Sequence, residues 1–297
     1  MVKTQGSKNQ IGGRLFQLIS PSDLKNQLHS TGDKPIVIDA RRRYEFSSGH
    51  IPGAVILRWE KYCEPAPEAS STVLQQPGWW GKLAEASSSM VAERLEHAGL
   101  RNDRHIVVYA DGAKSKGRDG RIAWMLLYFG AREVSLLNGG WSAWLEDDGA
   151  IELDITTPQV GNFVVDIDEE RRILLDDIMR SPQSIGVDTR TPEEHRGEIY
   201  DYQPRLGRIP NSVNVPFSRL YDASNKFLTK DSFERLLSEQ SNGNVQESTF
   251  DYSYCEVGVR AATFSLLHEL YLGRKLPVYD GSFMEWSFNE RLAVTRG

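Results

Sequence analysis

Apolar residues along the chain fall into two alternating patterns. IVID (36–39) and HIVVYAD (105–111) are short apolar runs of the kind found in buried strands. SSMVAERLEHAGL (88–100) and GRIAWMLLYFG (120–130) have the character of helices, and a glycine ends each pattern. Strands separated by helices predict parallel sheets with helices on both faces.

The second half of the chain repeats the order of the first. Three segments recur: VIDARRRYEF (37–46) as VDTRTPEEHR (187–196), HIPGAVILRW (50–59) as RIPNSVNVPF (208–217), and NGGWSAW (138–144) as DGSFMEW (280–286). A duplicated domain explains three matches in one order more simply than chance. We expect an α/β protein with domains at residues 15–150 and 165–297, joined by an acidic linker around 150–170.

Composition narrows the classes of function. The formal net charge of −6 argues against a nucleic-acid or membrane surface as the main partner. Two cysteines, Cys63 and Cys255, cannot form a disulfide framework, and their spacing matches no metal motif. No apolar run reaches the roughly 18 residues of a membrane span. We therefore expect neither a metal nor a membrane, and a reducing compartment.

The N-terminal segment bears on localisation. It lacks the apolar core of a secretory signal, so a cytoplasmic protein is the simplest expectation. Lys3, Lys8 and Arg14 precede the first acidic residue, which leaves a mitochondrial presequence as the alternative.

One cysteine lies where a strand pattern changes into a helix pattern. In STFDYSYCEVGVRAATFSLLHELY (248–271), aromatic residues alternate before Cys255 and leucines at helical spacing follow it. A helix N-terminus presents unpaired N–H groups and a partial positive charge, which stabilise a thiolate. Gly258 permits a tight turn, and Arg260 adds a charge that could hold an anion. These features predict a nucleophilic cysteine; the alternative is a small buried core residue.

These motifs resemble the tandem-domain rhodaneses, the thiosulfate and 3-mercaptopyruvate sulfurtransferases, over about residues 15–295. The family's D-x-R, GHIPGA and closing glycine–tryptophan motifs are similar to Asp39 with Arg41, GHIPGA (49–54) and YDGSFMEW (279–286). The resemblance implies two rhodanese-like domains, with Cys255 as the catalytic residue of the second. It also implies a silent first domain, because Ala110 occupies the cysteine's place.

The resemblance further implies how the protein acts. A sulfane sulfur would pass from a small anionic donor (thiosulfate, 3-mercaptopyruvate or another persulfide source) to a thiol, cyanide or a thioredoxin-like acceptor through a Cys255 persulfide. No cofactor is implied, and we expect a monomer or weak dimer. The six-residue loop around the persulfide is formed by Cys255, Glu256, Val257, Gly258, Val259 and Arg260.

The loop departs from the family in ways that leave the donor open. Thiosulfate-preferring members tend to have basic residues after the cysteine and mercaptopyruvate-preferring members Gly-Ser, whereas this chain has Glu256 and Val257. Four arginines are expected to bind substrate: Arg58, Arg190, Arg196 and Arg205. Arg58 would offset Glu256 from the first domain, where Trp59 would pack across the pocket mouth. A structural ion pair is the alternative for Arg190.

Two other functions remain open. Cysteine-dependent phosphatases and arsenate reductases use a similar thiolate, but the phosphatase loop needs five residues between cysteine and arginine and this chain has four. A non-catalytic binding module is the second alternative, favoured by Glu256 and by the degenerate GRIPNS (207–212). Cys63 is expected to be a packing thiol, with a reversible disulfide to Cys255 as the alternative.

Overall fold

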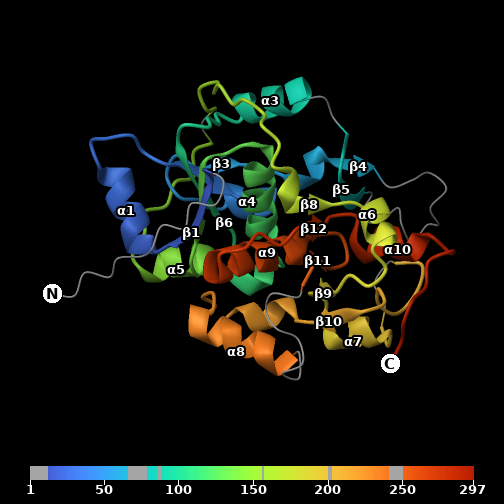
Figure 1. Cartoon of the computed structure of the whole chain (residues 1–297). Coiled ribbons are helices and arrows are strands. Elements are labelled where there is room, and N and C mark those ends of the chain that lie inside the picture. Colours follow the sequence, from blue (N-terminus) through green and yellow to red (C-terminus); the bar gives the residue numbers. More distant parts are fainter. Residues whose placement is uncertain (1–12, 66–78, 86–87, 156, 200–202, 241–249) are drawn as a thin grey trace.

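The computed structural model describes residues 13–65, 79–85, 88–155, 157–199, 203–240 and 250–297. Its two halves each contain a five-stranded parallel sheet (Figure 1). The first sheet has the order β1-β7-β6-β2-β3 and the second β10-β9-β11-β12-β8. Read from opposite ends, the two orders are the same, so the structure confirms the duplicated α/β plan.

The elements of the first half are these: β1 (Leu15–Ile19), α1 (Pro21–His29), β2 (Ile36–Asp39), α2 (Arg43–Ser47), β3 (Val55–Ile56), the 3-10 helix η1 (Trp59–Tyr62), β4 (Cys63–Pro65), β5 (Trp79–Leu83), α3 (Ser88–His97), β6 (His105–Tyr109), η2 (Gly112–Ser115), α4 (Arg118–Phe129), β7 (Glu133–Leu137) and α5 (Gly140–Glu146). β4 and β5 pair antiparallel and form a small separate sheet.

The second half has a matching set: η3 (Glu169–Arg171), β8 (Arg172–Ile173), α6 (Leu175–Arg180), β9 (Gly186–Asp188), α7 (Pro192–Arg196), β10 (Ser212–Asn214), η4 (Phe217–Leu220), α8 (Lys230–Gln240), β11 (Tyr252–Tyr254), α9 (Val259–Leu272), β12 (Val278–Tyr279) and α10 (Ser282–Phe288). Among the described helices none is long and apolar enough to span a bilayer.

The two halves share one hydrophobic core, because α4 and α9 pack against each other between the sheets (Figure 1). Gly120 of α4 permits this contact: a Cβ atom there would lie 2.0 Å from the Thr263 hydroxyl oxygen of α9. Both helices are buried on nearly all sides, which explains why their sequences are apolar around the whole helix. Successive strand residues face opposite sides of each sheet, and each half has a separate outer core beside the shared one. In β6, for example, Val108 packs into the shared core and Val107 into the outer core of the first half.

The linker runs along the first half. His50 and Glu152 exchange backbone hydrogen bonds of 3.0 and 2.8 Å, and Asp166 accepts hydrogen bonds from Arg14. These contacts hold the linker against the first half. The carboxyl ends of β6 and β11 lead into α4 and α9 at the interface between the halves.

Candidate active site

Cys255 directly follows β11, the central strand of the second sheet, and is only 1% exposed. Gly258 caps α9 in the left-handed conformation, with φ of +73°. A Cβ atom at Gly258 would lie 2.8 Å from the carbonyl oxygen of Asp280, so only glycine fits this tight turn. The strand, cysteine, glycine turn and helix predicted from the sequence are present in that order.

Four successive loop carbonyls are engaged by surrounding groups. The oxygens of Cys255 and Glu256 accept hydrogen bonds from the N–H groups of Phe283 and Met284, at 3.1 and 3.0 Å. Arg121 of the first domain donates to the Gly258 oxygen at 3.3 Å. The Val257 oxygen faces Gly81 of β5, where a Cβ atom would come within 1.8 Å of it. (Ser282 Oγ accepts from the Cys255 N–H at 3.2 Å.)

The loop N–H groups behave differently from the carbonyls. Within the described residues, the backbone N–H groups of Val257, Gly258 and Val259 have no hydrogen-bond acceptor. A planar peptide directs its N–H opposite to its carbonyl, so these donors point to the inner side of the loop. Consecutive inward N–H groups at a helix N-terminus form a concave site that stabilises an anion.

Charged side chains surround the loop. Arg260 pairs with Glu194 of α7 through two hydrogen bonds of 2.8 and 2.9 Å. Burial opposes the ionised form of Glu194, but the Arg260 hydrogen bonds and charge lower its pKa overall. Glu256 is 4% exposed, and its negative charge helps to raise the pKa of both Arg190 and Arg260 against the effect of burial. The acid beside the cysteine is therefore buried among charges rather than directed into open water.

Arg190 is fully buried in an ion pair with Asp188, at 2.7 Å. It also donates to the Gly207 oxygen at 2.8 Å and lies 4.1 Å from the ring centroid of Phe283. Burial raises the pKa of Asp188, but the Arg190 charge and the His195 hydrogen bond outweigh it and hold the pKa well below its usual range.

The first domain contains the same arrangement. Arg41 pairs with Asp39 at 2.6 Å, donates to the Gly49 oxygen at 2.6 Å and lies 4.2 Å from a Trp141 ring centroid. Because the pair recurs in a domain without the cysteine, the structure supports the structural alternative for Arg190.

The other three predicted substrate arginines are engaged elsewhere. Arg205 donates to four backbone carbonyls of residues 286–292, at 2.7 to 3.1 Å. Arg196 is half-buried and pairs with Glu198 at 2.6 Å. Arg58 is half exposed and pairs with Glu60 at 3.3 Å. Their role in substrate binding stays a prediction. Two further predicted arginines, Arg260 and Arg190, lie close enough to Glu256 of the loop for its charge to raise the pKa of each against the effect of burial.

Sequence reasoning missed two residues of the first domain that contact the loop, Gly81 and Arg121. It proposed Trp59 at the pocket mouth, whereas Trp59 is buried with its ring centroid 5.7 Å from the Arg121 guanidinium. A signal for Arg121 existed: it is a charged residue inside the otherwise apolar GRIAWMLLYFG. Which group it would reach depends on a contact between distant parts of the chain.

Cys63 lies on the outer side of this contact. Its thiol donates to the carbonyl oxygens of Gly81 and Trp59, at 3.3 and 3.5 Å. Burial raises the pKa of Cys63 to about 11, although Arg121 opposes the shift. Both cysteines are free thiols in this structure. The raised pKa of Cys63 favours its protonated, weakly nucleophilic form near neutral pH.

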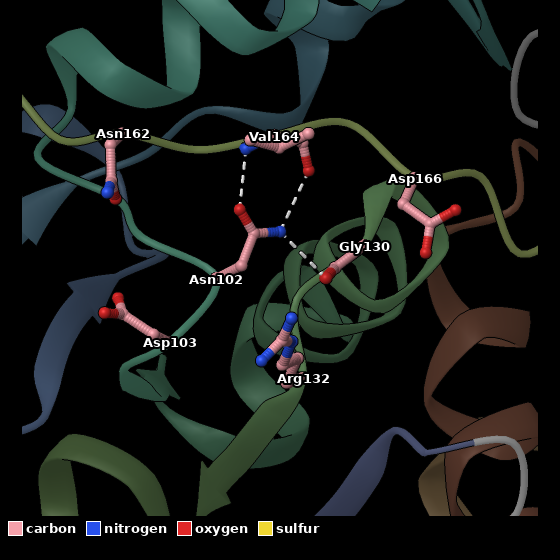
Figure 2. Close-up of a pocket in the computed structure, with 7 residues that line it drawn as sticks. All are labelled: Asn102, Asp103, Gly130, Arg132, Asn162, Val164 and Asp166. Carbon is pink, nitrogen blue, oxygen red and sulfur yellow. Dashed lines mark hydrogen bonds between the residues drawn. The ribbon is translucent and has the colours of Figure 1, made fainter.

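A polar pocket also lies between the first domain and the linker (Figure 2). The Asn102 amide spans it, donating to the oxygens of Gly130 and Val164 and accepting from the Val164 N–H. Its lining comprises Asn102, Asp103, Gly130, Arg132, Asn162, Val164 and Asp166. None of these residues belongs to the Cys255 loop. The hydrogen bonds of the Asn102 amide hold the linker against the first domain, which is a structural role.

Comparison with known proteins identifies both halves. The model of the Rhodanese-like domain matches residues 20–147 and 173–289. Among curated relatives, the putative thiosulfate sulfurtransferase SseB of Mycobacterium tuberculosis is 27% identical over 291 residues, covering 94% of this chain and 97% of the relative. The thiosulfate sulfurtransferase of Gallus gallus is 29% identical over 255 residues, covering 82% of this chain and 80% of the relative.

Solved structures agree on the fold. SseA from Escherichia coli, described as a 3-mercaptopyruvate sulfotransferase, has a TM-score of 0.73 at 23% identity, covering 89% of this chain and 98% of its own. EanB, solved as a cysteine persulfide with ergothioneine, has a TM-score of 0.78 at 21% identity, covering 94% of this chain and 70% of its own. At these identities the likeness concerns the fold.

Proposed function

The chain belongs to the rhodanese family, and on that premise we propose that it is a sulfurtransferase that carries a sulfane sulfur on Cys255. One observation supports this most: the loop after β11 ties its carbonyls to surrounding groups and leaves consecutive N–H groups without acceptors among the described residues. Such a site suits the negative charge of a thiolate or a persulfide. The names of the curated relatives support the same reaction class.

The proposed reaction is a double displacement. The Cys255 thiolate attacks the sulfur that the donor transfers, a sulfur–sulfur bond forms, and the bond between that sulfur and the rest of the donor breaks. The rest of the donor leaves with the electron pair as sulfite, as a thiolate, or as the enolate of pyruvate, which takes up a proton to become pyruvate. An acceptor then attacks the outer sulfur of the persulfide, and the Cys255 thiolate is regenerated. Cyanide would leave as thiocyanate, and a thiol or a thioredoxin-like protein would leave as its persulfide. The loop N–H groups stabilise the anionic sulfur in both steps.

The charges around the loop bear on the donor. Three arginines, Arg121, Arg190 and Arg260, are balanced by the three carboxylates of Asp188, Glu194 and Glu256. A dianion such as thiosulfate gains little from a site without net positive charge. We therefore expect thiosulfate to be a poorer donor than 3-mercaptopyruvate or a low-molecular-weight persulfide, each of which places less negative charge near the sulfur.

The test is a donor panel on the wild type and on two single-cysteine variants. Thiosulfate, 3-mercaptopyruvate and glutathione persulfide are each supplied with cyanide, and thiocyanate release is measured. Cys255→Ser should abolish release with every donor, because the nucleophile is lost. Cys63→Ser is the matched control and should keep most of the activity. Substantial turnover by folded Cys255→Ser would rule out the assignment.

A further inference from the structure

Arg121 is an unusual buried arginine. Four other arginines in the described residues are similarly buried, Arg14, Arg41, Arg171 and Arg190, and each pairs with a carboxylate. Arg121 is 0% exposed and makes no ion pair with a described residue. A buried charge without a carboxylate is costly, so its remaining contacts show what it stabilises.

Those contacts join the two domains at the catalytic loop. One Nη atom donates to the Gly258 oxygen at 3.3 Å, and the other donates to the Gly81 oxygen. The guanidinium also lies 4.8 Å from the Trp124 ring centroid, which holds its plane in place. A residue of the silent domain thus connects the loop glycine of the second domain to β5 of the first.

This connection determines which way the loop peptides face. Arg121 holds the Gly258 carbonyl outward, so the N–H of the same peptide, that of Val259, must face inward. Gly81 lies against the Val257 carbonyl, which likewise leaves the Gly258 N–H facing inward. Without these contacts either peptide could rotate, because glycine at 258 permits many backbone conformations.

We propose that Arg121, with Gly81, is a positioning residue that keeps the N–H groups of Gly258 and Val259 directed at the Cys255 sulfur. The inference rests on the proposed function, since it concerns the same sulfur. It gives the silent domain a specific task, which is to hold the outer face of the loop while chemistry occurs on the inner face.

The first test replaces Arg121 by lysine, which keeps the charge but cannot span two carbonyls. The rate of Cys255 alkylation by iodoacetamide is followed against pH by peptide mass spectrometry, a readout that requires no sulfur transfer. We expect the pH midpoint of alkylation to rise, kcat to fall by roughly 10- to 100-fold and KM to change by less than about threefold. Arg171→Lys changes another buried arginine and should leave the midpoint and kcat within about twofold of wild type.

The second test perturbs the loop without removing a charge. Gly81→Ala places a methyl group against the Val257 carbonyl, where it would lie 1.8 Å from the oxygen. Like Arg121→Lys, it should raise the pH midpoint of alkylation and lower kcat. Gly53→Ala is the matched control, because Gly53 has nearly the same φ, +73° against +74°, and nothing within 4 Å of the added Cβ. It isolates the backbone cost of alanine from the contact with the loop.

The outcomes separate this inference from the proposed function. If wild type transfers sulfur and folded Arg121→Lys and Gly81→Ala both match it in alkylation profile and kcat, the positioning role is wrong. If wild type transfers no sulfur but both variants still raise the alkylation midpoint, the positioning role holds and the proposed function fails. If Arg121→Lys does not fold, as judged by circular dichroism, Gly81→Ala against Gly53→Ala decides the question.

Discussion

The loops after β6 and β11 occupy equivalent places in the two domains and differ in one decisive respect. Each follows a tyrosine, Tyr109 or Tyr254, whose hydroxyl accepts an isoleucine N–H at 3.2 Å. The next residue, Ala110 or Cys255, accepts a hydrogen bond from the helix that closes the domain. The two loops therefore share these surrounding contacts, and of the two only the second loop contains a cysteine.

The first loop is longer and is filled by the other domain. The left-handed Gly117 that caps α4 comes seven positions after Ala110, whereas the left-handed Gly258 that caps α9 comes three positions after Cys255. Asn225 of the second domain accepts the Ala113 N–H at 3.0 Å, and a Cβ atom at Gly112 would lie 2.2 Å from its amide nitrogen. A side chain of the second domain thus binds an N–H group of the first loop, whereas the Val257, Gly258 and Val259 N–H groups of the second loop have no acceptor among the described residues.

The second residue of the following helix also differs. Arg260 of α9 is paired with Glu194. The equivalent Asp119 of α4 is 1% exposed, makes no ion pair with a described residue, and accepts the Gly120 N–H at 2.9 Å. Burial raises the pKa of Asp119 to about 6, and the nearby charge of Asp111 adds to the shift. The first domain therefore holds a poorly stabilised acid at the position where the second domain holds an arginine paired with a carboxylate.

The ion pair that both domains contain can be tested by removing its arginine from each domain in turn. Arg41→Met and Arg190→Met each leave a buried carboxylate without its arginine, which should lower the free energy of unfolding by about 3 to 5 kcal/mol in either domain. Urea denaturation measures both. If Arg190 is purely structural, the folded fraction of Arg190→Met keeps KM within about threefold of wild type. A tenfold rise in KM confined to Arg190→Met would assign it to substrate binding instead.

Asp119 provides a smaller effect with a defined pH dependence. Its folded pKa of about 6 lies above the ordinary value of 3.8, so the fold loses stability as pH rises through this range. Asp119→Asn removes that penalty and should raise the free energy of unfolding at pH 8 by at most about 3 kcal/mol. The gain should shrink below pH 6 and become small near pH 4. A gain that does not vary with pH would show that Asp119 is not the titrating group.

The charge of Glu256 should have a smaller effect, on the KM for the sulfur donor. Glu256→Gln removes a negative charge beside Cys255 and should lower the KM for thiosulfate by about tenfold, or about 1.4 kcal/mol. The KM for glutathione persulfide should change less, because that donor has less charge at the sulfur. Glu239→Gln removes an exposed acid of the same domain whose partner, Arg219, is not among the arginines expected to bind substrate, and it serves as the control. An unchanged thiosulfate KM would mean that the Glu256 charge does not reach the donor.

The sequence predicted those features of the structure that are determined by contiguous segments of the chain. Alternating strands and helices, the repeat and the CEVGVR turn are all encoded in contiguous segments, and the structure contains the fold and the turn in the predicted places. The contacts of Arg121, Gly81 and Asn225 could not be predicted, because each joins residues more than a hundred positions apart. The arginines were difficult for a related reason: a guanidinium can pair with any nearby acid or carbonyl, and only packing selects which one.

We propose that Cys255 carries the sulfur, in a loop whose N–H groups have no hydrogen-bond acceptor among the described residues. The direct measurement is intact mass and peptide mapping after brief treatment with 3-mercaptopyruvate or glutathione persulfide, without reductant. The account predicts an added mass of one sulfur atom on the peptide that contains Cys255, which cyanide removes as thiocyanate. A catalytically active protein with no such adduct, or with the sulfur on Cys63, would contradict it.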